Sequence, residues 1–192
     1  FQPTIDQKHI SDLATCMFIN KKENVILVGG SGTGKTHLAI SLAVKALSKE
    51  YSVYFTTVSD LLYNLHISKA DNSYPKKLKQ IVGYDLLVLD ELGFKQLPKY
   101  SSDDFFAIIS KRYEHKSTII TTNKEIEDWN DIFDEEVLTK AIVDRLMHYV
   151  SIFNIKGKSY RMKKFKKAEE KLRKNFYYRW YTFGANQWYT FN

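Results

Sequence analysis

Short apolar, mostly β-branched runs recur along the chain, and longer stretches with helical spacing of apolar residues lie between them. Runs of this kind predict strands, and apolar residues three or four apart predict helices. The expected strands lie at 25–28, 53–56, 86–89, 118–121 and 150–155. The expected helices lie near 37–48, 59–68, 103–115 and 135–149.

This alternation of strands and helices predicts an α/β fold, in which a five-stranded parallel sheet is covered by helices on both faces. Ligands of such folds bind beyond the carboxyl ends of the strands. Gly29, Asp90 and Asn123 all fall at such strand ends. The pattern therefore predicts that these three strand ends contribute to one site.

Length and composition limit the class of protein. The chain has 192 residues and 44% hydrophobic residues, which fits one globular domain with a sizeable core. It contains no apolar run near 18 residues and no secretory signal pattern, so we expect no membrane association. A single cysteine, Cys16, fits a reducing, cytoplasmic location. The five histidines are scattered, and no zinc site is expected.

The net charge of +7 is unevenly distributed. Residues 156–179 contain eleven Lys or Arg and two Glu, a net charge of +9, so the rest of the chain carries −2. A basic segment on a nearly neutral body suggests a polyanion partner such as nucleic acid. A solvated, charged helix face without a partner is the alternative.

The segment "GGSGTGKT" follows the first expected strand and opens the first expected helix. It matches G-x-x-x-x-G-K-[ST], in which backbone N–H groups surround phosphates, the lysine reaches the terminal phosphates and the hydroxyl binds Mg²⁺. Lys35 and Thr36 take the last two roles. The predicted phosphate loop consists of Gly29, Gly30, Ser31, Gly32, Thr33, Gly34, Lys35 and Thr36.

The segment "DLLVLDELG" reads as a buried strand that carries Asp90 to its tip. A carboxylate there can hold the Mg²⁺ that Thr36 shares. The adjacent Glu91 can orient and deprotonate an attacking water, which indicates hydrolysis of the nucleotide. Two acids that merely end a strand are the alternative.

Two further residues have more than one interpretation. Asn123, after "STIITT", could polarise the terminal phosphate, or it could simply mark a turn. Arg145, in "AIVDRLMHYV", could pair with Asp144 or Glu136. Alternatively, Arg145 could reach the nucleotide of a neighbouring subunit as a transition-state finger.

Six segments in order resemble the IstB-like ATP-binding proteins, which are the transposition helpers of insertion sequences. These segments are "VGGSGTGKTHLAISLA", "VYFTTVSDLLYNL", "DLLVLDELGF", "SKRYEHKSTIITTN", "AIVDRLMHYV" and "IKGKSYRMKK". That family belongs to the AAA+ ATPases and is close to the DnaC and DnaI helicase loaders. The resemblance implies a P-loop NTPase of AAA+ type without a C-terminal lid domain.

The resemblance also implies roles for single residues. Residues 29–36 match the Walker A loop, Asp90 and Glu91 the Walker B pair, and Asn123 the first sensor. Arg145 matches the arginine that reaches a neighbour's ATP, while the role of Arg161 stays open. The implied cofactors are ATP and Mg²⁺. The implied activity is ATP hydrolysis by an oligomer that assembles on DNA and passes it to a transposase.

Family members contact DNA after their second strand. The matching region here offers Lys69, Lys76, Lys77 and Lys79, which could meet phosphates or could be ordinary surface. The ATPase domain is expected at 1–168 and a basic, aromatic tail at 169–192, in which "WYTF" occurs twice. The chain begins about where the family's ATPase domain begins, so the N-terminal binding segment of the family is expected to be absent.

Two functions are therefore expected. The first is an ATPase that assembles on DNA and assists a transposase. The alternative is a loader that binds a replicative helicase and uses hydrolysis for release. The forms "DELG", "KSYR" and "STIITTN" favour the first.

Overall fold

Five parallel strands form a single sheet in the order β2-β3-β4-β1-β5, so β2 and β5 are the edges. The computed structural model describes residues 7–94, 97–98, 101–133, 135–157, 159–162, 164–170 and 172. The strands are β1 (Asn24–Val28), β2 (Val53–Thr57), β3 (Leu86–Leu92), β4 (Ser117–Thr122) and β5 (Val150–Asn154). The predicted five-stranded parallel sheet is confirmed.

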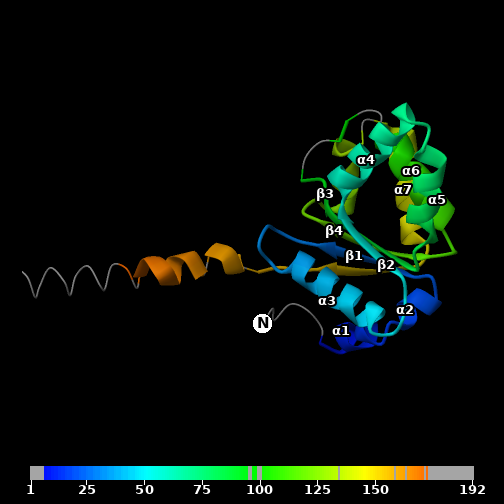
Figure 1. Ribbon diagram of the computed structural model, residues 1–192. Coiled ribbons are helices and arrows are strands. Elements are labelled where there is room, and N and C mark those ends of the chain that lie inside the picture. The colour runs from blue at the N-terminus through cyan, green and yellow to red at the C-terminus, as the bar shows by residue number, and fades with distance from the viewer. Residues whose placement is uncertain are drawn as a thin grey trace, which may run out of the picture. The chain divides into compact units, whose positions relative to one another are not determined.

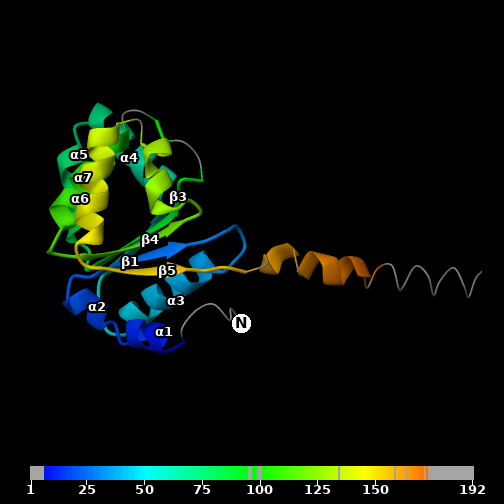
Figure 2. The ribbon, with the colours of Figure 1, turned by 180° about the vertical axis from the view of Figure 1, so that it is seen from behind.

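Helices cover both faces of the sheet (Figures 1 and 2). One face carries α1 (Gln7–Ala14), α2 (Met17–Asn20) and α3 (Lys35–Leu47). The other face carries α4 (Val58–Ala70), α5 (Tyr74–Gly83), α6 (Ser101–Arg112), the 3-10 helix η1 (Ile126–Asp131) and α7 (Glu136–Met147). The predicted arrangement with helices on both faces is therefore also confirmed.

The central strand β1 is apolar from Val25 to Val28 because both of its faces are covered. In β1, Val25 and Leu27 pack with α1, α2 and α3, whereas Ile26 and Val28 pack under the helices of the other face. All four side chains are buried. A strand of this kind has no solvent-facing side, so its sequence is a continuous hydrophobic run instead of an alternating one.

The observed helices differ from the predicted ones in two respects, which are the end of α6 and the presence of helices that were not predicted. α6 ends at Arg112 instead of continuing to residue 115, and Glu114 adopts a left-handed backbone with φ of 59°, which cannot continue a helix. The helices α1, α2 and α5 and the 3-10 helix were not predicted. In α5 the residues Tyr74, Leu78 and Ile81 do follow helical spacing, so a signal for it was present.

The chain divides after Gly157 into two compact units. In the second unit, residues 160–162 and 164–170 are helical. The predicted boundary at residue 168 stays a prediction, and the repeated "WYTF" of the predicted tail lies outside the described residues. Within the described ranges no helix is long and apolar enough to cross a membrane.

Candidate functional site

The predicted phosphate loop, Asp90 and Asn123 lie together where the carboxyl ends of the central strands meet. The central strands β3, β4 and β1 are neighbours, and their carboxyl ends lie side by side. The Gly29 N–H donates to the carbonyl of Thr122 at 3.1 Å, so the loop begins beside the residue that precedes Asn123.

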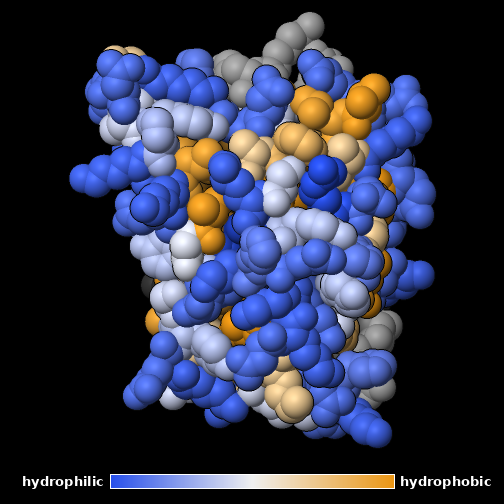
Figure 3. All heavy atoms as spheres, turned by 90° about the vertical axis from the view of Figure 1, so that its right-hand side faces the viewer, coloured by the Kyte–Doolittle hydropathy of each residue, from blue (hydrophilic) through white to orange (hydrophobic). Residues whose placement is uncertain are grey.

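The amino ends of the strands lie on the opposite side of the molecule. The surface there is mostly hydrophilic with a few hydrophobic groups (Figure 3).

Two glycines of the loop are required for different reasons. A Cβ on Gly29 would lie 2.4 Å from the carbonyl oxygen of Ile155, which is closer than real Cβ contacts come. Gly34 instead has φ of 103°, a conformation that disfavours any side chain, and the space beside it is open. Gly29 is therefore required because the chain after β5 leaves no room for a side chain. Gly34 is required because the backbone turn into α3 has a positive φ.

The loop ends in an anion-binding arrangement. α3 starts at Lys35, its N-cap Gly34 supplies no side-chain hydrogen bond, and its first turn holds no acid. The first N–H groups of a helix point out of its start, and the helix dipole there favours a negative ligand. The Lys35 ammonium bends back over the loop and donates to the carbonyls of Gly29 at 2.6 Å and Gly30 at 2.9 Å. A phosphate oxygen is a stronger acceptor than these neutral carbonyls.

The residues expected to hold Mg²⁺ lie together. The Thr36 hydroxyl donates to Oδ1 of Asp90 at 3.0 Å, and Asp90 is 5% exposed. A hydroxyl and a carboxylate form the hard oxygen donor set that Mg²⁺ prefers, and it takes its remaining ligands from water and phosphates. In the described part of the chain, no three His, Cys, Asp or Glu side chains cluster closely enough to hold a metal alone. The observed pair therefore fits an ion shared with a nucleotide.

Glu91 is exposed beside the buried Asp90. Its φ of 64° is left-handed, which is unusual for a residue with a side chain. Its N–H donates to the hydroxyl of Thr121 at 3.0 Å, and that hydroxyl in turn donates to Asp90 Oδ1. Thr121 was not among the predicted site residues, although it lies within the "STIITTN" segment.

Asn123 lies directly after β4 and is exposed at the same edge. The preceding hydroxyl of Thr122 accepts the Lys124 N–H at 3.1 Å, which turns the chain immediately after the strand. The turn interpretation is thus correct for the backbone, and it is compatible with a sensing role for the exposed amide.

Arg145 lies away from the phosphate loop of its own chain. The neighbouring Leu146 carbonyl accepts a hydrogen bond from Asn24, which begins β1, whereas the loop follows the other end of β1, about 13 Å away at 3.3 Å per residue. The guanidinium donates to the carbonyl of Ala141 at 2.8 Å and lies 4.9 Å from the ring centre of Phe106.

The acids considered as partners of Arg145 are engaged differently or exposed. Glu136 pairs with Lys140 at 2.7 Å, and Asp144 is exposed on α7. The contacts of Arg145 are therefore with a carbonyl and an aromatic ring. A role at the nucleotide of another subunit stays a prediction.

The four candidate DNA-contacting lysines are not equivalent. Lys69 pairs at 2.8 Å with Asp104, whose side chain is 3% exposed, and it lies over the ring of Tyr74. Lys69 thus has a structural partner. Lys76 and Lys79 are exposed on α5, and Lys77 is half-buried.

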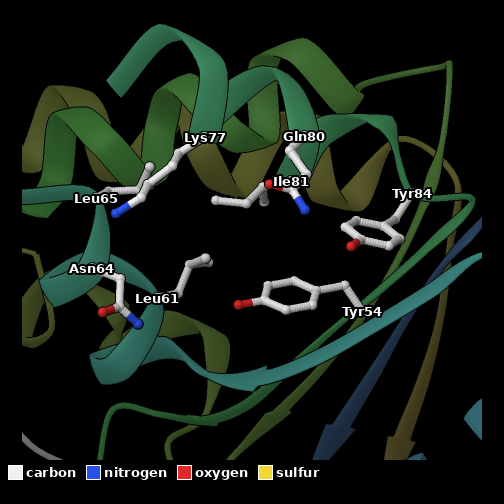
Figure 4. A pocket seen from close by; sticks show the side chains of 8 residues that line it. All are labelled: Tyr54, Leu61, Asn64, Leu65, Lys77, Gln80, Ile81 and Tyr84. Carbon is white, nitrogen blue, oxygen red and sulfur yellow. The ribbon is translucent and has the colours of Figure 1, made fainter. Parts of the chain in front are cut away.

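Lys77 lines a pocket between α4 and α5, beside the edge strand β2 (Figure 4). The pocket has a volume of about 200 Å³ and a rim of Asn64, Gln80 and the stacked rings of Tyr54 and Tyr84. Its apolar lining consists of Leu61, Leu65 and Ile81. None of these residues belongs to the phosphate loop or to the ends of β1, β3 and β4, so the pocket is separate from the nucleotide site.

The strand order, the loop between β1 and α3 and the acids at the tip of β3 define a P-loop protein of AAA+ type. A sequence model of the family "IstB-like ATP binding protein" matches residues 1–168. The chain therefore belongs to the IstB-like ATP-binding proteins, and the family resemblance inferred from the sequence is confirmed.

Individual relatives agree with this assignment. The ATP-binding protein named for insertion sequence IS5376 of Geobacillus stearothermophilus is 41% identical over 170 residues, which cover 88% of this chain and 68% of the relative. The one named for IS21 of Pseudomonas aeruginosa is 42% identical over 168 residues, which cover 88% and 63%. The chain thus spans about two thirds of their length.

The fold has a solved counterpart of nearly matching extent. The crystal structure of the DnaC helicase loader is similar with a TM-score of 0.67 and 27% sequence identity. The similar region covers 81% of this chain and 94% of that one.

Proposed function

We propose that this protein is an ATPase that assembles on DNA and assists the transposition of an insertion sequence. The observation that carries the hydrolytic part is the contact of Thr36 with Asp90 at the mouth of the phosphate loop, with Glu91 directly following. This arrangement supplies a ligand pair for a metal ion and a second carboxylate for a water molecule. The names of the relatives, which refer to ATP binding and insertion sequences, support both parts.

In the proposed reaction, the N–H groups at the start of α3 and the Lys35 ammonium bind and orient the phosphates of ATP. Thr36 and Asp90 would hold Mg²⁺, which when bound would neutralise charge on the phosphates. Glu91 accepts a proton from the attacking water, whose oxygen forms a bond to the terminal phosphorus while the bond to the leaving ADP oxygen breaks. The exposed Asn123 amide hydrogen-bonds the terminal phosphate. Arg145 of a neighbouring subunit completes the site, so that turnover depends on assembly.

The proposed DNA contacts come from α5. Exposed Lys76 and Lys79 would neutralise phosphates, with Lys77 between them at the rim of the pocket. Ammonium groups are point charges, so such contacts depend on salt and are largely independent of base sequence. Lys69 is engaged by Asp104 and contributes by positioning the helix.

Removing the lysine of the loop tests nucleotide binding. Lys35→Ala is expected to lose ATP binding, measured by titration with a fluorescent ATP analogue, because the charge at the terminal phosphates disappears. Lys45→Ala, an exposed lysine of the same helix, is the matched control and is expected to bind normally. Normal affinity in Lys35→Ala would contradict the phosphate-loop assignment.

Removing the proposed general base tests hydrolysis. Glu91→Gln is expected to bind ATP normally and to lose turnover by about 10²-fold or more, since general-base catalysis contributes about that much. Phosphate release at saturating ATP and Mg²⁺ measures this. Unchanged turnover would remove Glu91 from the role.

A helicase loader is the second candidate, favoured by the structural similarity to DnaC. The two functions differ in what stimulates turnover. The transposition helper is expected to hydrolyse ATP faster when duplex DNA is added. A loader is expected to respond to a replicative helicase and to be indifferent to duplex DNA alone.

A further inference from the structure

The two acids of the candidate site lie in an irregular part of the sheet. β3 and β4 pair regularly up to Leu89 and Ile120, and the next pair is Leu92 with Thr122. Asp90 and Glu91 of β3 therefore face a single residue of β4, Thr121. This two-against-one arrangement is a β-bulge, a feature that redirects side chains near active sites.

The two neighbouring acids of the bulge lie in different environments. Successive side chains of a strand point to opposite faces. Here Asp90 is 5% exposed, whereas Glu91, with its left-handed φ of 64°, is exposed. A residue with a side chain holds such a backbone only where its surroundings fix it.

The Thr121 hydroxyl supplies that support. Thr121 is 1% exposed, and its hydroxyl accepts the N–H of Glu91 while donating to the carboxylate of Asp90. The N–H of Glu91 thus binds a side chain of β4. One hydroxyl can act as donor and acceptor together, which a valine of the same shape cannot do.

We propose that Thr121 is a positioning residue for ATP hydrolysis, whose hydroxyl sets the Glu91 backbone and the Asp90 carboxylate in their working orientation. The inference rests on the proposed hydrolytic role of Glu91. The bond from Thr121 to Asp90 would hold that carboxylate in place if the Thr36 hydroxyl turned toward a bound metal ion. Thr121 therefore acts through both acids.

Three variants separate the hydroxyl from the shape of the side chain. Thr121→Val keeps the shape and removes the hydroxyl, Thr121→Ser keeps the hydroxyl, and Thr121→Ala removes both. We expect Thr121→Val to lower kcat by about tenfold to a hundredfold, since small misplacements of a catalytic group have effects of this size. KM for ATP should change by less than about twofold, because the phosphate loop is intact.

Thr121→Ser is expected to stay within about threefold of the unaltered protein. If Thr121→Val fails to fold, Ser against Ala provides the same comparison, since both lack the methyl group and only Ala lacks the hydroxyl. An Mg²⁺ titration of turnover should show a higher midpoint without the hydroxyl, which reports on Asp90 separately.

A double variant decides whether the effect passes through Glu91. If Thr121 acts by positioning Glu91, then Thr121→Val should reduce the residual turnover of Glu91→Gln little further at saturating Mg²⁺. A full, independent loss in the double variant would overturn the proposal. So would normal kcat in Thr121→Val while Glu91→Gln is inactive. Normal turnover in Glu91→Gln itself would instead contradict the proposed function.

Discussion

At the scale of single residues, the chemistry of this chain follows from a few positions with unusual backbones. Glu91 and Gly93 both have positive φ, and both flank the tip of β3. Gly93 of the "DELG" segment has φ of 82°, which disfavours any side chain, and an added Cβ would lie 2.8 Å from Cδ1, the flexible end of the Ile132 side chain. Ile132 is the residue that directly follows η1.

Gly93→Ala is expected to destabilise the fold by about 2 kcal/mol or more, since a left-handed Ala costs about 1–2 kcal/mol and the contact with Ile132 adds to it. The matched control is Gly83→Ala at the end of α5, where a Cβ meets nothing within 4 Å. That change is expected to be neutral or to stabilise by up to about 1 kcal/mol. Urea denaturation of both variants measures the difference, and equal effects would contradict this account.

The sequence predicted those site residues whose roles depend on local spacing. The phosphate loop is one contiguous segment, and Asp90, Glu91 and Asn123 follow buried runs, so their common edge could be inferred from the fold class. Thr121 could not be found in this way, because its role depends on a bulge between two strands. The contacts of Arg145 also depend on tertiary structure, since Phe106 lies on α6.

At the scale of elements, α6 holds α5 at both ends. Its Asp104 binds Lys69 at the end of α4 and the hydroxyl of Tyr74 at the start of α5. Burial and the hydrogen bond to Asp104 raise the pKa of Tyr74 to about 12. Near its other end, the buried Arg112 donates to the carbonyls of Ile81, Val82 and Tyr84. Each charge matches the sign that the dipole of α5 favours at that end.

Arg112 is 1% exposed, and burial lowers its pKa to about 10, so the guanidinium is charged at neutral pH. Arg112→Met is expected to destabilise the fold by about 2–4 kcal/mol, because several buried carbonyls lose their donor. The exposed neighbour Lys111→Met should change stability by less than about 0.5 kcal/mol. Thermal denaturation compares the two variants, and a mild effect of Arg112→Met would show that α5 does not need this anchor.

Lys69 is expected to have a structural role, whereas Lys76 is expected to contact DNA. Lys69→Met should lower stability by about 1–3 kcal/mol, since the buried Asp104 loses its ion pair. Lys76→Met should leave stability unchanged and reduce the slope of log affinity for duplex DNA against log salt by about 1. Filter binding over a range of salt, together with denaturation, tests both. A DNA defect without a stability change in Lys69→Met would reverse this assignment.

The strands were predicted more closely than the helices for a physical reason. A covered strand contains a continuous apolar run, such as residues 25–28 and 86–89, and such a run is easily located in the sequence. α5 was missed because lysines and a proline dominate its sequence and only its face toward the core is apolar. Its position depends on Asp104 and Arg112, which are distant in sequence.

At the scale of the whole molecule, the strands are also fastened at their amino ends, opposite the nucleotide site. The Asp85 carboxylate accepts hydrogen bonds from the N–H and hydroxyl of Ser52 before β2, and it pairs with Lys116 before β4 at 2.6 Å. Asp85 itself precedes β3. These contacts hold the pKa of Asp85 well below its ordinary value of 3.8.

A depressed carboxyl pKa makes stability depend on pH in one direction. The contribution of Asp85 is present above about pH 4 and is lost as the pH falls below that value, where the unfolded chain takes up the proton first. Asp85→Asn is therefore expected to lower Tm at pH 7 and to differ less and less from the unaltered protein below pH 4. Asp12→Asn, an exposed acid on α1, is the control. A constant difference from pH 7 to pH 3 would contradict the assignment.

The central claim, that ATP is hydrolysed at sites completed by a neighbouring subunit, is tested most directly by mixing two inactive variants on duplex DNA. Arg145→Ala retains its own acids, and Glu91→Gln retains its arginine. Each alone should bind ATP but turn it over slowly. Random assembly of equal amounts would complete about a quarter of the sites, because a head-to-tail interface joins the two partial sites in one order only. Recovery of about that fraction of turnover is the predicted result. Full activity of Arg145→Ala alone, or no recovery on mixing although both variants bind ATP and assemble, would contradict the claim.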